Sequence, residues 1–228
     1  MKLLVITDSY PPHHSGGYEI RCKNVVEGLI KRGHDVRIIT TRCTQKKCNL
    51  HAGETGIYRI LHRKAGENSL IKKIFHDTND LRFIDGQIKT FNPDIIYLWH
   101  LINLSDAIIP FFSRFDYPVV YDEGGNGLVN SIKRENGPVY FYKSKNLVKK
   151  GVKNLLSLGI QKFSLDLIKR VWVLPQKMYM IFNSNYALNF AKERHVPVDH
   201  ARVIHSGVDT SIFRYLHREK MGEPVKII

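Results

Sequence analysis

The sequence predicts an α/β fold built on a doubly wound, mostly parallel sheet, and two observations support this. Short apolar runs alternate with segments of helical spacing along most of the chain. One run, residues 95–99 (IIYLW), is apolar throughout, as is typical of a parallel strand buried on both faces. Ligands of such sheets bind outside the carboxyl ends of the strands, so we expect the site in the loops that follow them.

The first forty residues predict a complete strand–helix–strand unit. Residues 3–6 form an apolar strand, and residues 8–17 a loop that ends in two glycines. Gly33 is placed to end the following helix in the left-handed conformation, before a second strand at 36–41. The helix itself is predicted by apolar side chains at positions i, i+3, i+4 and i+7: Cys22, Val25, Val26 and Leu29.

The later elements follow the same alternation. The strands are predicted at 56–61, 95–99, 118–121, 178–182 and 202–204, and the helices at 70–91, 104–115 and 184–193. Residues 131–175 carry no strand signal, and their apolar spacing predicts a helical, basic insertion.

Charge favours an anionic partner. The 228 residues carry a formal net charge of +14. Between residues 133 and 177 there are eleven basic residues and two acidic ones, so the excess is local. Nucleic acid, anionic lipid or a phosphorylated substrate would each suit such a surface.

The three cysteines, Cys22, Cys43 and Cys48, cannot all pair within the chain, which favours a reducing compartment. The first strand begins too early for a signal peptide, and no apolar run approaches the roughly 18 residues of a membrane span. We therefore expect a cytoplasmic protein, with peripheral attachment to the inner face of the membrane left open. His51 near Cys43 and Cys48 lacks a fourth ligand, so no metal is expected.

Gly16 and Gly17 are the first candidate site residues. Backbone amides and the positive end of the helix dipole favour an anion at a helix N-terminus. The pair is neither a dinucleotide fingerprint nor a P-loop, and a simple flexible turn is the alternative.

Two further candidates follow the next strands. His100 comes directly after residues 95–99 and could bond a sugar hydroxyl or a phosphate, or could be structural. Asp122 and Glu123, with Asn126 nearby, could bind a sugar, act as a base, or cap the next helix.

Lys145, Lys149 and Lys153 form a basic stripe with the spacing of a helix. Each lysine near an anionic membrane contributes about 1 kcal/mol, and a solvated helix face is the alternative. Nucleic acid is not expected as a partner, because no recognised binding motif accompanies the basic segment.

Two separated signatures carry a family resemblance. The first is the opening unit, in which Pro11-Pro12 precede Gly16-Gly17 and Glu19, and whose helix closes in KRGHDV. The second is NSNY at residues 183–186, followed by RVIHSGVD at 202–209. Together they resemble the N-terminal domain of the family 4 glycosyltransferases, which have two Rossmann-like domains in a GT-B fold.

This resemblance implies transfer of a sugar from a nucleotide-diphosphate donor to a carbohydrate or lipid-linked acceptor, with retention of configuration and without a metal or other cofactor. It places Gly16 and Gly17 against the donor diphosphate and sugar, and gives His100 a positioning role. The implied acceptor contacts are Tyr10, Asp122, Glu123 and Asn126, although the family often has His-Asp where this chain has Asp122-Glu123. Gly207 and Asp209 match a G-V-D turn that shapes the passage to the next domain.

The resemblance divides the chain into a Rossmann-like, acceptor-side domain at 1–216 and a linker at 217–228, where VKII begins the first strand of a C-terminal domain. That domain would hold most nucleotide contacts, so the chain alone is expected to be inactive. Two alternatives stay open: an epimerase-like GT-B enzyme, and a basic module that binds membranes or anions without catalysis. The sequence names neither the donor nor the acceptor.

Overall fold

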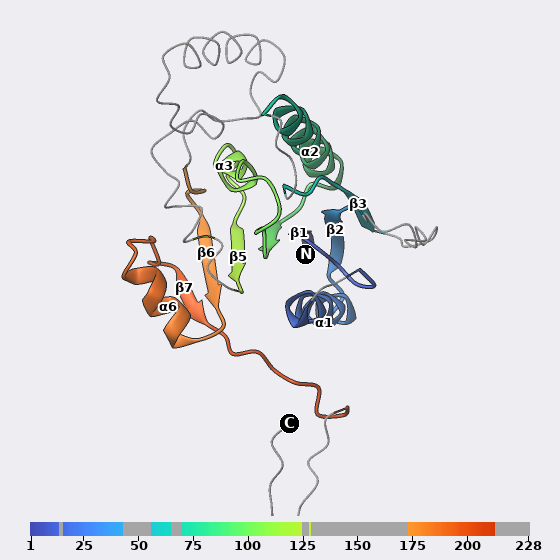
Figure 1. Ribbon diagram of the computed structural model, residues 1–228. Coiled ribbons are helices and arrows are strands. Elements are labelled where there is room, and N and C mark those ends of the chain that lie inside the picture. The colour runs from blue at the N-terminus through green and yellow to red at the C-terminus, as the bar shows by residue number, and fades with distance from the viewer. Residues whose placement is uncertain (14–15, 43–55, 65–69, 125–127, 129–172, 213–228) are drawn as a thin grey trace, which may run out of the picture.

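The computed structural model describes residues 1–13, 16–42, 56–64, 70–124, 128 and 173–212 (Figure 1). Within these residues, seven strands form one parallel sheet in the order β3-β2-β1-β4-β5-β6-β7. The strands are β1 (Lys2–Thr7), β2 (Asp35–Thr41), β3 (Ile57–Leu61), β4 (Ile95–Trp99), β5 (Val119–Glu123), β6 (Met178–Phe182) and β7 (Ala201–Val203). The helices are α1 (Gly17–Lys31), α2 (Leu70–Phe91), α3 (Ile108–Phe112) and α6 (Asn185–Lys192). The predicted α/β, Rossmann-like sheet is confirmed.

The sheet is buried on both faces. Successive side chains of a strand point to opposite faces, so Leu4 and Ile6 of β1 pack with α2 and α3, whereas Leu3 and Val5 pack with α1. Figure 1 shows α2 and α3 on one side of the sheet and α1 on the other. Burial of both faces of β1 explains why its sequence is a continuous apolar run.

Helix α1 ends as the sequence predicts. Gly33 has φ of +81°, in the left-handed region that favours glycine. The N–H of Gly33 donates to the carbonyl of Ile30 at 2.9 Å, and the N–H of His34 donates to that of Leu29 at 3.2 Å. This Schellman pattern satisfies the last carbonyls of the helix and turns the chain into β2.

Two predicted elements differ from the structure by more than one residue at an end. The helix predicted at 104–115 is only α3, because Ser105 accepts the N–H of Ala107 through its hydroxyl at 3.1 Å and starts the helix late. Beyond α3 the chain makes tighter i to i+3 bonds, such as Phe115 to Phe112 at 3.2 Å. Strand β5 extends to Glu123, two residues past the predicted end, because it stays paired with β6.

All seven strands run in one direction, so the residues at their carboxyl ends meet at a single edge of the sheet. Asp8 follows β1, His62 follows β3, His100 follows β4, and Asp122 and Glu123 end β5. The N-terminus of α1 lies at the same edge, because the helix follows the loop after β1. Residues 131–172 of the predicted insertion and the linker at 217–228 lie outside the described residues.

Candidate active site

The side chain of Tyr18 joins three of the predicted site segments. It lies in the first turn of α1, directly after Gly16 and Gly17. Its ring meets the ring of His100 edge-on, with centroids 4.8 Å apart. Its hydroxyl donates to the backbone carbonyl of Asp122 at 2.5 Å and to a carboxylate oxygen of Asp122 at 2.7 Å. The glycine loop, the end of β4 and the end of β5 therefore form one cluster.

The two glycines at the N-terminus of α1 are not equivalent. The N–H of Gly16 donates to a carboxylate oxygen of Glu19 at 3.1 Å, and Glu19 is buried. This side chain already supplies an anion to the first amide, as in a capping box. A Cβ built on Gly17 would meet no atom within 4 Å among the described residues. The space beside the Cα of Gly17 is therefore open among the described residues, whereas the Gly16 amide is engaged.

His100 has an unusual backbone and an unsatisfied side chain. Its φ is +41°, which a residue other than glycine adopts at a cost of about 1–3 kcal/mol. Its Nδ1 atom is buried and has no hydrogen-bond partner among the described residues. Strained residues with unmet hydrogen-bonding capacity cluster at ligand sites, so these two features agree with a ligand-facing position.

The carboxylate of Asp122 is held by side chains from α1 and from β4, where Tyr97 is one of its hydrogen-bond partners. Nη2 of Arg21 lies 2.5 Å from one carboxylate oxygen, and the hydroxyl of Tyr18 bonds the same oxygen. The guanidinium also lies over the rings of Tyr18 and Trp99, at 5.3 and 5.1 Å from their centroids. Burial raises the pKa of Asp122, while Tyr18 and Arg21 act in the opposite direction. In the structure, the carboxylate of Asp122 fixes the side chains of Tyr18 and Arg21.

Glu123 takes the capping geometry that the sequence left as one alternative. A carboxylate oxygen of Glu123 accepts the N–H of Leu128 at 2.8 Å, and Leu128 is helical. Between them, Gly124 packs so closely on Tyr18 that a Cβ there would lie 1.9 Å from the ring. The remaining predicted acceptor residue of this segment, Asn126, lies outside the described residues.

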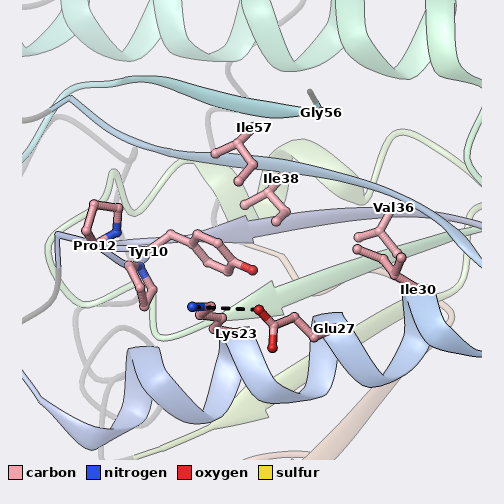
Figure 2. Close-up of a pocket in the computed structure, with 10 residues that line it drawn as sticks. Tyr10, Pro12, Lys23, Glu27, Ile30, Val36, Ile38, Gly56 and Ile57 are labelled. Carbon is pink, nitrogen blue, oxygen red and sulfur yellow. Dashed lines mark ion pairs between the residues drawn. The ribbon is translucent and has the colours of Figure 1, made fainter. Parts of the chain in front are cut away.

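Tyr10 lies in the loop between β1 and α1, before the glycine pair. It is buried, and its carbonyl accepts a hydrogen bond from Arg59 at 2.9 Å. Together with residues of α1, β2 and β3 it lines a pocket of about 360 Å³ that none of His100, Asp122 and Glu123 lines. Figure 2 shows Tyr10 and Pro12 at one end of this pocket. The structure thus does not bring Tyr10 together with the other predicted acceptor residues.

The segment with the G-V-D turn returns to α1. Arg21 donates to the hydroxyl of Ser206 at 3.1 Å, and Asp209 accepts the N–H and the hydroxyl of Ser211 at 2.9 and 2.6 Å. These Ser211 bonds hold the pKa of Asp209 below its usual value. A Cβ on Gly207 would meet nothing within 4 Å. Through Arg21 this turn contacts the site cluster rather than only the exit from the domain.

The remaining sequence predictions concern a basic stripe, a metal site and a membrane span. Lys145, Lys149 and Lys153 are outside the described residues. Within the described part, no group of three or more His, Cys, Asp or Glu side chains could hold a metal ion. None of the described helices has the length and hydropathy needed to cross a membrane.

Sequence reasoning missed Tyr18, Arg21 and Trp99, which make most of the contacts in the cluster. Tyr18 follows the glycine pair directly, and this adjacency was the available signal. Arg21 and Asp122 are 101 positions apart, so nothing local pointed to their ion pair.

Comparison with solved structures places the sheet among the GT-B glycosyltransferases. Sucrose-phosphate synthase from Thermosynechococcus elongatus superposes over 92% of this chain and 49% of its own, with a TM-score of 0.54 and 13% identity. MurG from Acinetobacter baumannii matches 92% of this chain and 69% of its own at 12% identity, but its TM-score of 0.39 is too low to support an argument. The chain thus spans about half the length of the synthase.

A curated sequence relative gives the same class. An uncharacterised glycosyltransferase of Methanocaldococcus jannaschii is 48% identical over 40 residues, which are 18% of this chain and 10% of the relative. The GT-B type of fold and the family model over residues 15–212 together define a glycosyltransferase domain. The model of Glycosyltransferase Family 4 matches residues 15–212, and the chain belongs to that family.

Proposed function

We propose that this family 4 member transfers a hexosyl group from a nucleotide-diphosphate sugar to a hydroxyl acceptor with retention of configuration. The carboxyl edge of the sheet then forms the acceptor-side wall of the reaction cleft. The observation that carries the proposal is the open N-terminus of α1 at Gly17, adjacent to Tyr18, whose ring contacts the strained His100. A helix N-terminus suits a diphosphate, and an imidazole suits a sugar hydroxyl.

The role of each residue follows from its contacts. The Gly17 amide and the dipole of α1 stabilise negative charge that grows on the departing diphosphate. Because Glu19 already occupies the Gly16 amide, the phosphate is expected nearer Gly17. His100 positions the transferring sugar through its unpartnered Nδ1. Asp122 supports this arrangement by holding Tyr18 against His100.

We propose that no metal cofactor is needed, since amides, a helix dipole and basic residues can neutralise a diphosphate. Addition of EDTA should leave the rate unchanged. A rate that falls with EDTA and recovers with Mg²⁺ would contradict this part of the proposal.

The test of the reaction uses the protein that carries this chain and a panel of nucleotide-diphosphate sugars. Release of a nucleoside diphosphate identifies the donor, and the proton NMR spectrum of the new glycoside gives its anomeric configuration. Retention supports the proposal, and inversion overturns its stereochemical part. Conversion of the donor into an epimer without transfer would favour the epimerase-like alternative instead.

Attachment of the protein to an anionic membrane is a prediction that rests on the sequence alone. Sedimentation with vesicles of phosphatidylcholine and an anionic phospholipid should bring the protein down at low salt. Replacement of Lys145, Lys149 and Lys153 by glutamate should abolish binding. Equal sedimentation of the variant and the wild type would exclude this stripe as the contact.

A further inference from the structure

A second polar cluster lies at the same edge, around Asp8, which follows the central strand β1. Asp8 is 3% exposed. One carboxylate oxygen, Oδ2, accepts a hydrogen bond from the side-chain amide of Asn103 at 2.5 Å. The other, Oδ1, is buried without a hydrogen bond among the described residues. Leaving a buried carboxylate oxygen without a donor is unfavourable, so its persistence requires an explanation.

The nearest cation is too far away to supply the missing bond. Nη2 of Arg63 lies 3.8 Å from Oδ1 of Asp8, beyond hydrogen-bonding distance, and instead donates to the hydroxyl of Ser9 at 2.6 Å. A ligand hydroxyl between them could donate to Oδ1 and accept from the guanidinium, because a hydroxyl is both donor and acceptor. A phosphate or carboxylate could only accept, and would be repelled by Asp8.

Asp8 also interacts electrostatically with His100 of the candidate active site. Burial raises the pKa of Asp8, whereas the hydrogen bond from Asn103 and the nearby Arg63 and His100 lower it. Its partners Arg63 and Asn103 come from the chain after β3 and the loop after β4. The cluster therefore adjoins His100 without using the amide of Gly17.

Access depends on one surface side chain. Arg63 is 38% exposed at its side chain, so its guanidinium can move without disturbing the core. The backbone of Asp8 is held in place, because its carbonyl accepts hydrogen bonds from the hydroxyls of Thr41 at 2.5 Å and Thr40 at 3.3 Å. The carbonyl of Asn103 accepts the N–H of Lys64 at 2.6 Å. A fixed carboxylate with an amide partner and a movable cation is suited to binding a polyol.

We propose that Asp8, with Arg63 and Asn103, binds a hydroxyl group of the acceptor, and that the acceptor presents an uncharged sugar or cyclitol ring at this point. The proposal rests on the proposed glycosyl transfer. Asp8 Oδ1 accepts the hydroxyl proton in a hydrogen bond, and Arg63 donates to the hydroxyl oxygen. No covalent step is assigned to either residue.

The test is an NMR titration of the ¹⁵N-labelled chain with methyl glycosides of common hexoses and with myo-inositol. At least one probe should shift the side-chain amide resonances of Asn103. Asp8→Asn should weaken its binding about tenfold to a hundredfold, the range for a hydrogen bond to a charged group. Asp116→Asn is the matched control, because Asp116 is 81% exposed and pairs with Lys177 away from the edge.

Arg63→Gln is the second variant and changes a partly exposed side chain, so its fold should survive even where Asp8→Asn does not. It should weaken the same probe by a similar factor. Equal affinity in wild type and either folded variant overturns the proposal, and so does the absence of binding by every probe. Donor turnover is measured in parallel with the protein that carries this chain: its absence counts against the glycosyl transfer itself, whereas turnover with unchanged probe binding rejects only the Asp8 site.

Discussion

The guanidinium of Arg21 lies 2.5 Å from the carboxylate of Asp122, and this ion pair ties helix α1 to the end of strand β5. The Asp122 side chain is 2% exposed and that of Arg21 is 17% exposed. Removal of Arg21 leaves a buried carboxylate without its charged partner. Arg21→Met should therefore lower the free energy of unfolding by about 3–5 kcal/mol in urea titrations.

The matched control for this pair is Lys23→Met. Lys23 and Glu27 form an ion pair on the same helix at 3.6 Å, but both are about half exposed. Its loss should cost no more than about 1 kcal/mol. Equal effects of the two substitutions would show that burial of the Arg21–Asp122 pair does not matter. Adding Asp122→Asn to Arg21→Met should recover part of the loss.

Gly124 should be required by its contact with Tyr18. A Cβ at this position would lie 1.9 Å from the phenol ring, which is itself fixed by Asp122 and His100. Gly124→Ala should destabilise the fold by about 1–3 kcal/mol, as for other overpacked sites. Gly86→Ala, in open space within α2, should raise stability by about 0.5–1 kcal/mol. A neutral Gly124→Ala in thermal unfolding would refute the close packing.

Titration of Asp80 should make the free energy of unfolding depend on pH. Burial raises the pKa of Asp80 to about 7, although the N–H of His62 bonds its carboxylate at 2.9 Å. Between pH 3.8 and about 7 the unfolded chain loses this proton while the folded chain keeps it. The free energy of unfolding should therefore fall as pH rises through that window.

Asp80→Asn should remove this slope, and the difference in unfolding free energy between variant and wild type should grow with pH up to about 7. The variant must be compared with the wild type at each pH, because His62 contributes a slope of the opposite sign. Burial and Arg42 lower the pKa of His62, which by itself makes the free energy of unfolding rise with pH below 6.5. A difference independent of pH in urea titrations would show that Asp80 titrates normally.

Glu19→Gln should strengthen binding of a nucleoside diphosphate. The carboxamide oxygen can still accept the N–H of Gly16, so the cap of α1 is retained, but the negative charge beside the proposed phosphate is removed. The expected gain at low salt is about two- to fivefold in Kd, measured by calorimetry. Glu27→Gln, about two turns further along the exposed side of α1, should change nothing. Weaker binding by the Glu19 variant would place the phosphate elsewhere.

The sequence predicted the sheet well because parallel strands and their helices leave local periodic signals. The run at β4 and the apolar stripe of α1 are such signals, and Gly33 ends α1 as expected. The helix at α3 was overestimated, because the hydroxyl of Ser105 competes with the helical pattern in a way that apolar spacing does not reveal.

The site was predictable only in part. Glycines and polar residues after strands could be located, but their partners come from distant positions: Tyr18 and Arg21 meet Asp122 over a hundred residues later. Asp8 gave no local signal beyond its place after a strand, since its importance depends on Oδ1 being buried without a hydrogen-bond donor among the described residues. Such information exists only once the strand order is known.

The central claim is that the N-terminus of α1 at Gly17 faces the donor diphosphate. Its most direct test is kcat/KM for release of nucleoside diphosphate in Gly17→Val, compared with Gly28→Val in the same helix, where a Cβ also meets no neighbour. Gly17→Val should lower this value about a hundredfold or more, because the valine side chain would keep the diphosphate from the amide and so cost as much as losing an oxyanion donor, whereas Gly28→Val should stay near normal. Equal activity of the two folded variants would contradict it.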